Sequence, residues 1–182
     1  NSGKLSDVEN KVTELIKKDK ENFVLYNIFG TVLIDKKNFK EGIINYEKSL
    51  KINPNYAEGH NNLGIALYKL GKYIESINSY KHAIKLNSKY AEAHYNLGTT
   101  LHELEEYHKA IAYYQNAIKF ESQNPKFYYN LALSEIELGN YSVAIENYKK
   151  ALEISNEYTS AKYNLARLNL AIENFSEGWK DF

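Results

Sequence analysis

The sequence contains neither cysteine nor methionine, and it has only two prolines in 182 residues. Without cysteine there is no disulfide framework, no thiolate metal site and no cysteine nucleophile. A chain without methionine is most simply a piece of a longer protein. The sequence also lacks an excess of either charge, because 23 Lys and Arg residues balance 23 Asp and Glu residues. Nucleic-acid-binding and membrane-surface proteins usually carry a basic excess, so we expect neither kind of partner.

Long apolar segments are absent as well. No apolar run approaches the ~20 residues that a helix needs to cross a membrane, and the first ten residues contain no signal-peptide core. We therefore expect no membrane span and a cytoplasmic location. The sequence also has no glycine-rich phosphate loop, no Gly-x-Ser-x-Gly and no His-Glu-x-x-His. We expect no catalytic residue, no cofactor and no metal site, although the chain could be part of a larger enzyme.

What the sequence does contain is a repeated motif. Tyr-Asn-Leu stands at residues 95–97, 129–131 and 163–165, and Asn-Asn-Leu stands at 61–63. The leucines of these motifs follow one another at intervals of 34 residues: Leu63, Leu97, Leu131 and Leu165. A fixed period in this range is typical of a chain that stacks one supersecondary unit.

Helical periodicity fills each repeat. Apolar or small residues recur at i, i+3, i+4 and i+7, and no segment alternates as a strand does. We align five repeats that start near residues 23, 57, 91, 125 and 159. In each, a first helix should end near 35, 69, 103, 137 or 171, and a second helix near 52, 86, 120 or 154. Residues 1–22 match the second helix of a preceding repeat, and the fifth repeat is cut short at Phe182. The sequence therefore predicts a single all-α array over residues 1–182.

Small residues stand at three fixed places of the repeat, the eighth, the twentieth and the twenty-seventh. They are Gly30, Gly64, Gly98, Ala132 and Ala166; Gly42, Ser76, Ala110, Ala144 and Gly178; and Ser49, Ala83, Ala117 and Ala151. Helices whose axes lie about 8–10 Å apart need small residues where they cross. This pattern resembles the tetratricopeptide repeat (TPR) family. The resemblance implies a right-handed solenoid of antiparallel helix pairs that binds proteins or peptides.

A polar face remains on each first helix. A helical wheel that turns Leu97 toward the core places two columns of residues on the opposite side. The asparagine column is Asn62, Asn96, Asn130 and Asn164, and the adjacent column is Asn61, Tyr95, Tyr129 and Tyr163. In a stacked array of helix pairs this concave face is the usual binding surface. We assign four further residues to the groove: Thr99, His102, Lys126 and Arg167.

The asparagine column needs a physical reason, because asparagine is a poor residue for the interior of a helix. A carboxamide both donates and accepts hydrogen bonds, so it can pair with the backbone of an extended ligand whatever that ligand's side chains. The column is similar to the asparagine ladder that grips peptide backbone in the TPR arrays of O-linked N-acetylglucosamine transferases. The alternative is that these asparagines hydrogen-bond to the adjacent repeat. The scattered cations Lys69, Lys126 and Arg167 do not form a clamp for a C-terminal carboxylate.

The sequence thus predicts a protein interaction module that holds an extended peptide or protein segment in its concave groove. Two alternatives stay open. The chain could be the substrate-recruiting arm of a glycosyltransferase whose catalytic domain lies outside it, or a self-associating assembly scaffold. Because the last repeat stops within its second helix, we expect five apolar residues to be incompletely covered: Leu165, Leu168, Ile172, Phe175 and Trp179. This C-terminal edge is predicted to dock on a continuation of the chain or to form a homodimer.

Overall fold

The computed structural model describes residues 2–172, with side chains from Leu5 onward. Over that range the chain forms ten α-helices and no strand. It divides into two compact halves, residues 1–88 and 89–182. The all-α prediction is confirmed. That the two halves belong to one array over residues 1–182 stays a prediction.

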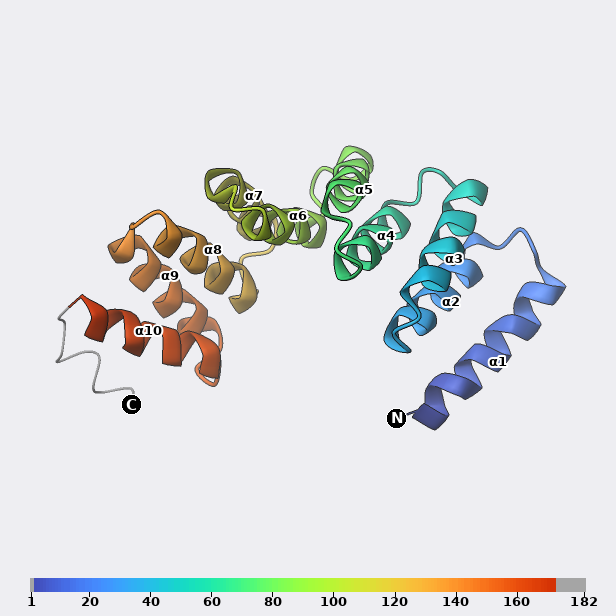
Figure 1. The fold of residues 1–182 in the computed structure, drawn as a ribbon, viewed down its shortest axis with the longest axis horizontal. Coiled ribbons are helices and arrows are strands. Elements are labelled where there is room, and N and C mark those ends of the chain that lie inside the picture. Colours follow the sequence, from blue (N-terminus) through green and yellow to red (C-terminus); the bar gives the residue numbers. More distant parts are fainter. Residues whose placement is uncertain (1, 173–182) are drawn as a thin grey trace. The chain divides into compact units, whose positions relative to one another are not determined.

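The N-terminal half consists of a leading helix and two helix pairs. Its elements are α1 (Ser2–Lys18), α2 (Phe23–Asp35), α3 (Phe39–Ile52), α4 (Ala57–Lys69) and α5 (Tyr73–Leu86). Figure 1 shows α2 antiparallel to α3 and α4 antiparallel to α5. The leading helix α1 packs against α2, as expected for the second helix of a preceding repeat.

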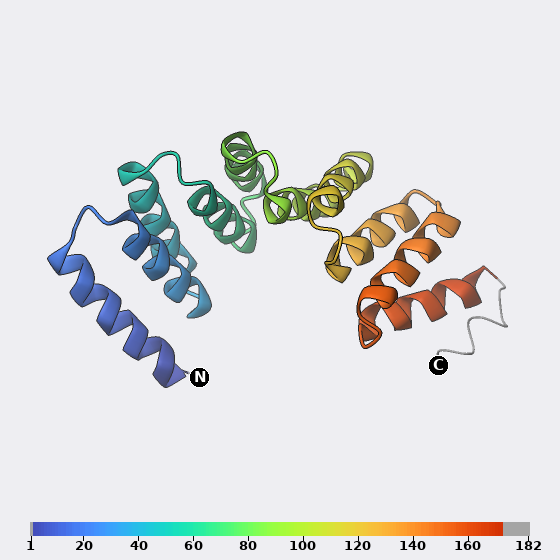
Figure 2. The same cartoon turned by 180° about the vertical axis from the view of Figure 1, so that it is seen from behind.

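The C-terminal half contains two further pairs and one more first helix. Its elements are α6 (Ala91–Glu103), α7 (Tyr107–Phe120), α8 (Pro125–Glu137), α9 (Tyr141–Ile154) and α10 (Thr159–Ala171). Figure 2 shows α8 and α9 as an antiparallel pair with α10 beside α9. All five first helices, α2, α4, α6, α8 and α10, begin and end at the residues that the 34-residue alignment predicts.

A buried tyrosine on the second helix explains the small residue on the first. The twenty-fourth place of the repeat holds tyrosine in all four complete pairs, and each ring is buried: Tyr46, Tyr80, Tyr114 and Tyr148. A Cβ atom built on Gly98 would lie 2.8 Å from the ring of Tyr114, and one on Gly64 would lie 2.5 Å from that of Tyr80. Only a very small residue lets the two helices approach this closely.

The turns within the repeats share one backbone geometry. The residue at the fifteenth place has a positive φ in every complete pair: Lys37 (62°), Gly71 (77°), Glu105 (60°) and Gly139 (75°). The next amide in the chain bonds back five residues, for example Lys72 N to Leu67 O at 2.9 Å. This left-handed cap satisfies carbonyl groups that the end of the helix leaves open. It fixes the angle at which each second helix returns along the first.

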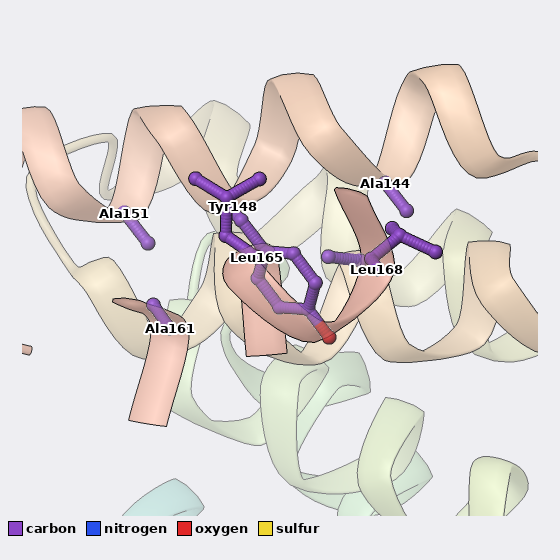
Figure 3. Close-up of a cluster of buried hydrophobic side chains, with 7 residues drawn as sticks. Ala144, Tyr148, Ala151, Ala161, Leu165 and Leu168 are labelled. Atoms are coloured by element: carbon purple, nitrogen blue, oxygen red, sulfur yellow. The ribbon is translucent and has the colours of Figure 1, made fainter. Parts of the chain in front are cut away.

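The core of the C-terminal half connects repeats 4 and 5. Ala144, Tyr148 and Ala151 of α9 pack with Ala161, Leu165 and Leu168 of α10 (Figure 3). Leu165 is 4% exposed and Leu168 is 8% exposed. The expectation that these two leucines are incompletely covered is therefore wrong, because repeat 4 already buries them. Ile172 is 39% exposed, as expected.

Several sequence predictions fall outside the described residues. They concern the second helix of repeat 5, with Phe175, Gly178 and Trp179, and the edge that this helix would form. The homodimer through the C-terminal edge depends on this segment and stays a prediction.

Candidate functional site

The asparagine column lies on four first helices, with Asn62 on α4, Asn96 on α6, Asn130 on α8 and Asn164 on α10. All four side chains are half-buried rather than fully exposed. Each sits one place before the leucine that enters the core, so the helix fixes its direction.

The asparagines hydrogen-bond between repeats. Within the N-terminal half, Asn62 Nδ2 donates to Asn27 Oδ1 at 3.1 Å. Within the C-terminal half, Asn130 Nδ2 donates to the Tyr95 hydroxyl at 2.7 Å, and Asn164 Nδ2 donates to the Tyr129 hydroxyl at 3.0 Å. In all three bonds the acceptor stands 35 residues earlier in the sequence, at the fifth place of the preceding repeat. Inter-repeat bonding, the alternative raised by the sequence, is thus present in the structure.

These bonds leave the asparagine carbonyl oxygens available. Asn130 Nδ2 also donates to the Lys126 backbone oxygen at 3.1 Å, so both of its N–H groups are engaged. The Asn130 Oδ1 atom accepts no hydrogen bond from any described residue. The same holds for the Oδ1 atoms of Asn62 and Asn164. An amide that is anchored through its nitrogen can still accept a hydrogen bond from a peptide N–H.

The adjacent column differs from the prediction at its first member. Asn61 is only 1% exposed, although the helical wheel turned it toward the groove. The fifth place lies where one first helix meets the next, so a short side chain is covered there. Tyrosine is longer and extends further outward: Tyr95 and Tyr129 are half-buried, and Tyr163 is 52% exposed.

Aromatic contacts hold the tyrosines of this column in place. The Tyr95 ring lies 5.0 Å from that of Phe127, and the Tyr129 ring lies 5.2 Å from that of Tyr158. Burial raises the pKa of Tyr95 above its ordinary value, and hydrogen bonds with Thr99 and Asn130 partly offset this effect. The Tyr95 hydroxyl therefore stays protonated at neutral pH. Contacts at these distances are favourable and restrict ring motion.

The four further groove residues divide into two pairs. Thr99 and His102 serve internal bonds: Tyr114 OH donates to Thr99 Oγ1 at 3.4 Å, and His102 Nδ1 shares a 2.8 Å hydrogen bond with Ser134 Oγ. Lys126 and Arg167 are exposed. Arg167 lies over the Tyr163 ring, with its guanidinium carbon 5.6 Å from the ring centroid.

Two depressions in the C-terminal half are lined by five of the predicted residues. One, of about 220 Å³, is lined in part by Tyr95, Asn96 and Lys126. The other, of about 450 Å³, lies between α8, α9 and α10 and is lined in part by Asn164 and Arg167. We call the second depression the α8–α10 pocket.

The sequence analysis missed the residues that form most of the α8–α10 pocket. Tyr148, Leu133 and Ile136 were not singled out as site residues from the sequence. All three line the pocket. A comparison of repeats 3 and 4 would have identified two of them, because Leu133 stands at the place of Thr99 and Ile136 at the place of His102.

The described residues form no metal cluster and no membrane-spanning helix. Among the described residues, no three His, Cys, Asp or Glu side chains are arranged to hold a metal ion. The described helices are too short or too polar to cross a membrane. The equivalent histidines of repeats 2 and 3 have separate surroundings, since His60 stacks on His82 while His94 contacts Tyr113 and Phe120.

Antiparallel helix pairs with small residues at their crossings, and with a polar column along the first helices, define a helical-repeat interaction module. Comparison with protein families agrees. TPR repeat models match residues 30–71 and 66–105, and tetratricopeptide repeat models match 91–124 and 125–158. The chain belongs to the tetratricopeptide repeat family, and it is a protein–protein interaction module of that family.

Solved structures share the fold. The crystal structure of a MamA protein is 29% identical and has a TM-score of 0.78, over 84% of this chain and 90% of that one. YrrB, described as a TPR protein with an unusual peptide-binding site, is 20% identical with a TM-score of 0.74, over 93% and 88% of the two chains. PilF of Pseudomonas aeruginosa is 20% identical with a TM-score of 0.82, over 89% and 74%. No curated protein sequence matches the chain.

Proposed function

We propose that this protein binds an extended segment of a partner protein along its first helices, with no chemistry of its own. The proposal rests on the hydrogen bonding of the asparagine column. The amide nitrogens of Asn62, Asn130 and Asn164 are anchored to the preceding repeat, whereas their carbonyl oxygens accept nothing from the described residues. Within the C-terminal half, the fixed acceptors of Asn130 and Asn164 are suited to the N–H groups of an extended backbone, which repeat regularly along the peptide.

The surroundings of the column support the same function. Tyr95, Tyr129 and Tyr163 flank it with large, partly exposed rings that lose little conformational freedom on binding. The two depressions described above could receive side chains of the bound segment. Lys126 and Arg167 line different depressions, so affinity should come from backbone and aromatic contacts rather than from a cluster of charge.

The experiment selects peptides of about twelve residues from a random display library on the full chain, and then measures the affinity of one chosen peptide by calorimetry. Asn130→Ala removes the acceptor and should weaken binding by about 1 kcal/mol, roughly fivefold. Replacing a contacting peptide N–H by N-methyl should weaken binding similarly and should add nothing in the Asn130→Ala variant.

Two control variants separate binding from folding. Asn147→Ala removes a carboxamide from α9 that makes the same type of backbone bond, Nδ2 to Val143 O at 2.9 Å, away from the first helices. Tyr95→Phe removes the inter-repeat acceptor and leaves the Asn130 oxygen in place. Asn147→Ala should leave affinity unchanged, and Tyr95→Phe should reduce stability more than affinity. If Asn130→Ala lowers the melting temperature while peptide affinity holds, the column is purely structural and the proposal is wrong.

A further inference from the structure

The α8–α10 pocket combines apolar walls with a polar base. Its volume of about 450 Å³ falls within the range of small-ligand sites, about 300–1,000 Å³. The apolar lining comes from α8 and α10 and comprises Leu133, Ile136, Leu168, Ala171 and Ile172. Tyr148 contributes to the lining from α9, and Figure 3 shows its side chain extending past Leu168 with the hydroxyl oxygen far from the α9 backbone.

The Tyr148 hydroxyl lacks the threonine partner that two of its three equivalents possess. In repeat 1 the Tyr46 hydroxyl bonds to Thr31 Oγ1 at 3.1 Å, and in repeat 3 the Tyr114 hydroxyl donates to Thr99 Oγ1 at 3.4 Å. The ninth place of repeat 4 is Leu133, whose side chain cannot form a hydrogen bond. The Tyr148 hydroxyl is buried and has no hydrogen-bond partner among the described residues. A buried polar group without a partner is rare in native proteins and requires an explanation.

A second polar contact is missing at the same place. His102 and Ser134 share a hydrogen bond that connects the first helices of repeats 3 and 4. One repeat further along, the equivalent residues are Ile136 and Leu168, and both line the pocket. Three polar residues have thus been replaced by apolar ones around a hydroxyl that was kept. The result is a largely apolar space in which the Tyr148 hydroxyl and the Asn164 carbonyl oxygen are available for hydrogen bonding.

We propose that the α8–α10 pocket binds an uncharged phenol-type group, the side chain of a tyrosine in the partner protein. This inference rests on the proposed function, since it names the side chain that anchors the bound segment. The ring of such a group fits the apolar walls. Its hydroxyl can both donate and accept, and so can pair with the Tyr148 hydroxyl in either direction.

The charges of the lining favour an uncharged group. Arg167 and Glu137 are the charged side chains of the pocket, and their charges cancel. The Arg167 guanidinium already lies over the Tyr163 ring. Burial also raises the pKa of Tyr148 above its ordinary value, so that its hydroxyl is neutral. An anion that entered the pocket would therefore lose its hydration without gaining a cationic side chain of its own, which is unfavourable.

The test uses free small molecules and does not require a groove peptide. Binding of N-acetyltyrosinamide and N-acetylphenylalaninamide to the full chain is measured by NMR titration. Wild-type protein should bind the tyrosine probe about fivefold or more tightly than the phenylalanine probe, which is the preference that one hydrogen bond supports. Tyr148→Phe should abolish this preference. Tyr114→Phe, at the equivalent place in repeat 3, should leave it unchanged.

The outcomes are distinct from those of the groove experiment, because the probes carry no extended chain. Equal affinity for the two probes, a preference that persists in Tyr148→Phe, or no binding of either probe would each overturn the proposal. Tighter binding of N-acetyl-phosphotyrosinamide would show that the pocket takes an anion and would also overturn it. Loss of peptide binding on Asn130→Ala, combined with no probe preference, would leave the proposed function standing and remove this inference alone.

Discussion

Replacing Tyr148 by phenylalanine should stabilise the protein, which is unusual for a change in a fully buried residue. The substitution keeps the ring, which is 0% exposed, and removes only the hydroxyl that has no described partner. A buried hydroxyl without a partner costs about 1–3 kcal/mol, so its removal should raise the free energy of unfolding by about 1 kcal/mol. The ring packing against Leu165 and Leu168 is retained.

Tyr114→Phe is the matched control. It removes the same atom from the equivalent place, but here the hydroxyl donates to Thr99 at 3.4 Å. The loss of this long bond should lower the free energy of unfolding by about 0.5–1 kcal/mol. The two variants should therefore shift the urea midpoint in opposite directions, with similar dependence on denaturant because the exposed surface barely changes.

The assay is urea denaturation followed by circular dichroism at pH 7. If Tyr148→Phe destabilises the protein as much as Tyr114→Phe does, the Tyr148 hydroxyl has a partner, such as a buried water. In that case the pocket lacks the unused hydrogen-bonding group on which its proposed chemistry depends.

Two further predictions concern packing and pH. Ala144→Leu should lower the free energy of unfolding by about 1–3 kcal/mol, because Ala144 is 0% exposed where α9 crosses α8. The control Ala112→Leu, at an exposed site of α7, should change it by no more than about 0.5 kcal/mol in the same urea titration. Burial raises the pKa of Tyr148 above its ordinary value of 10.0, so the folded state accepts only the neutral hydroxyl; the free energy of unfolding should therefore not depend on this group below about pH 10 and should fall as the pH rises further. The melting temperature should fall above that pH by less in Tyr148→Phe than in wild type, and an equal fall in both would contradict this assignment.

The sequence was sufficient to predict the helix boundaries because each element occurs several times. A single helix end is usually uncertain by one or two residues. Here the 34-residue alignment gives the same helix ends in every repeat. The positive φ that Gly71 and Gly139 share with Lys37 and Glu105 was not predicted and is seen only in the structure.

The candidate site was predicted less completely, for two physical reasons. A helical wheel gives the direction of a side chain but not what covers it, so Asn61 was placed in the groove although it is buried. The donor of each inter-repeat bond is visible in the sequence as asparagine, whereas its acceptor can be either asparagine or tyrosine. Leu133 stands at the place in repeat 4 that Thr99 holds in repeat 3, so the sequence could have shown that Tyr148 lacks a threonine partner. The pocket itself could be found only from the structure.

The inter-repeat bonds restrict how the length of this chain can change. Asn62, Asn130 and Asn164 each find an acceptor 35 residues earlier, which is one repeat plus one residue. One residue inserted in α8 ahead of Asn130 would rotate that asparagine by about 100° around the helix axis and move it away from Tyr95. Duplicating or deleting a whole block of 34 residues would restore an acceptor at the same distance. Gene duplication can therefore lengthen this protein one repeat at a time, while a single-residue insertion within a first helix would break the bond to the preceding repeat.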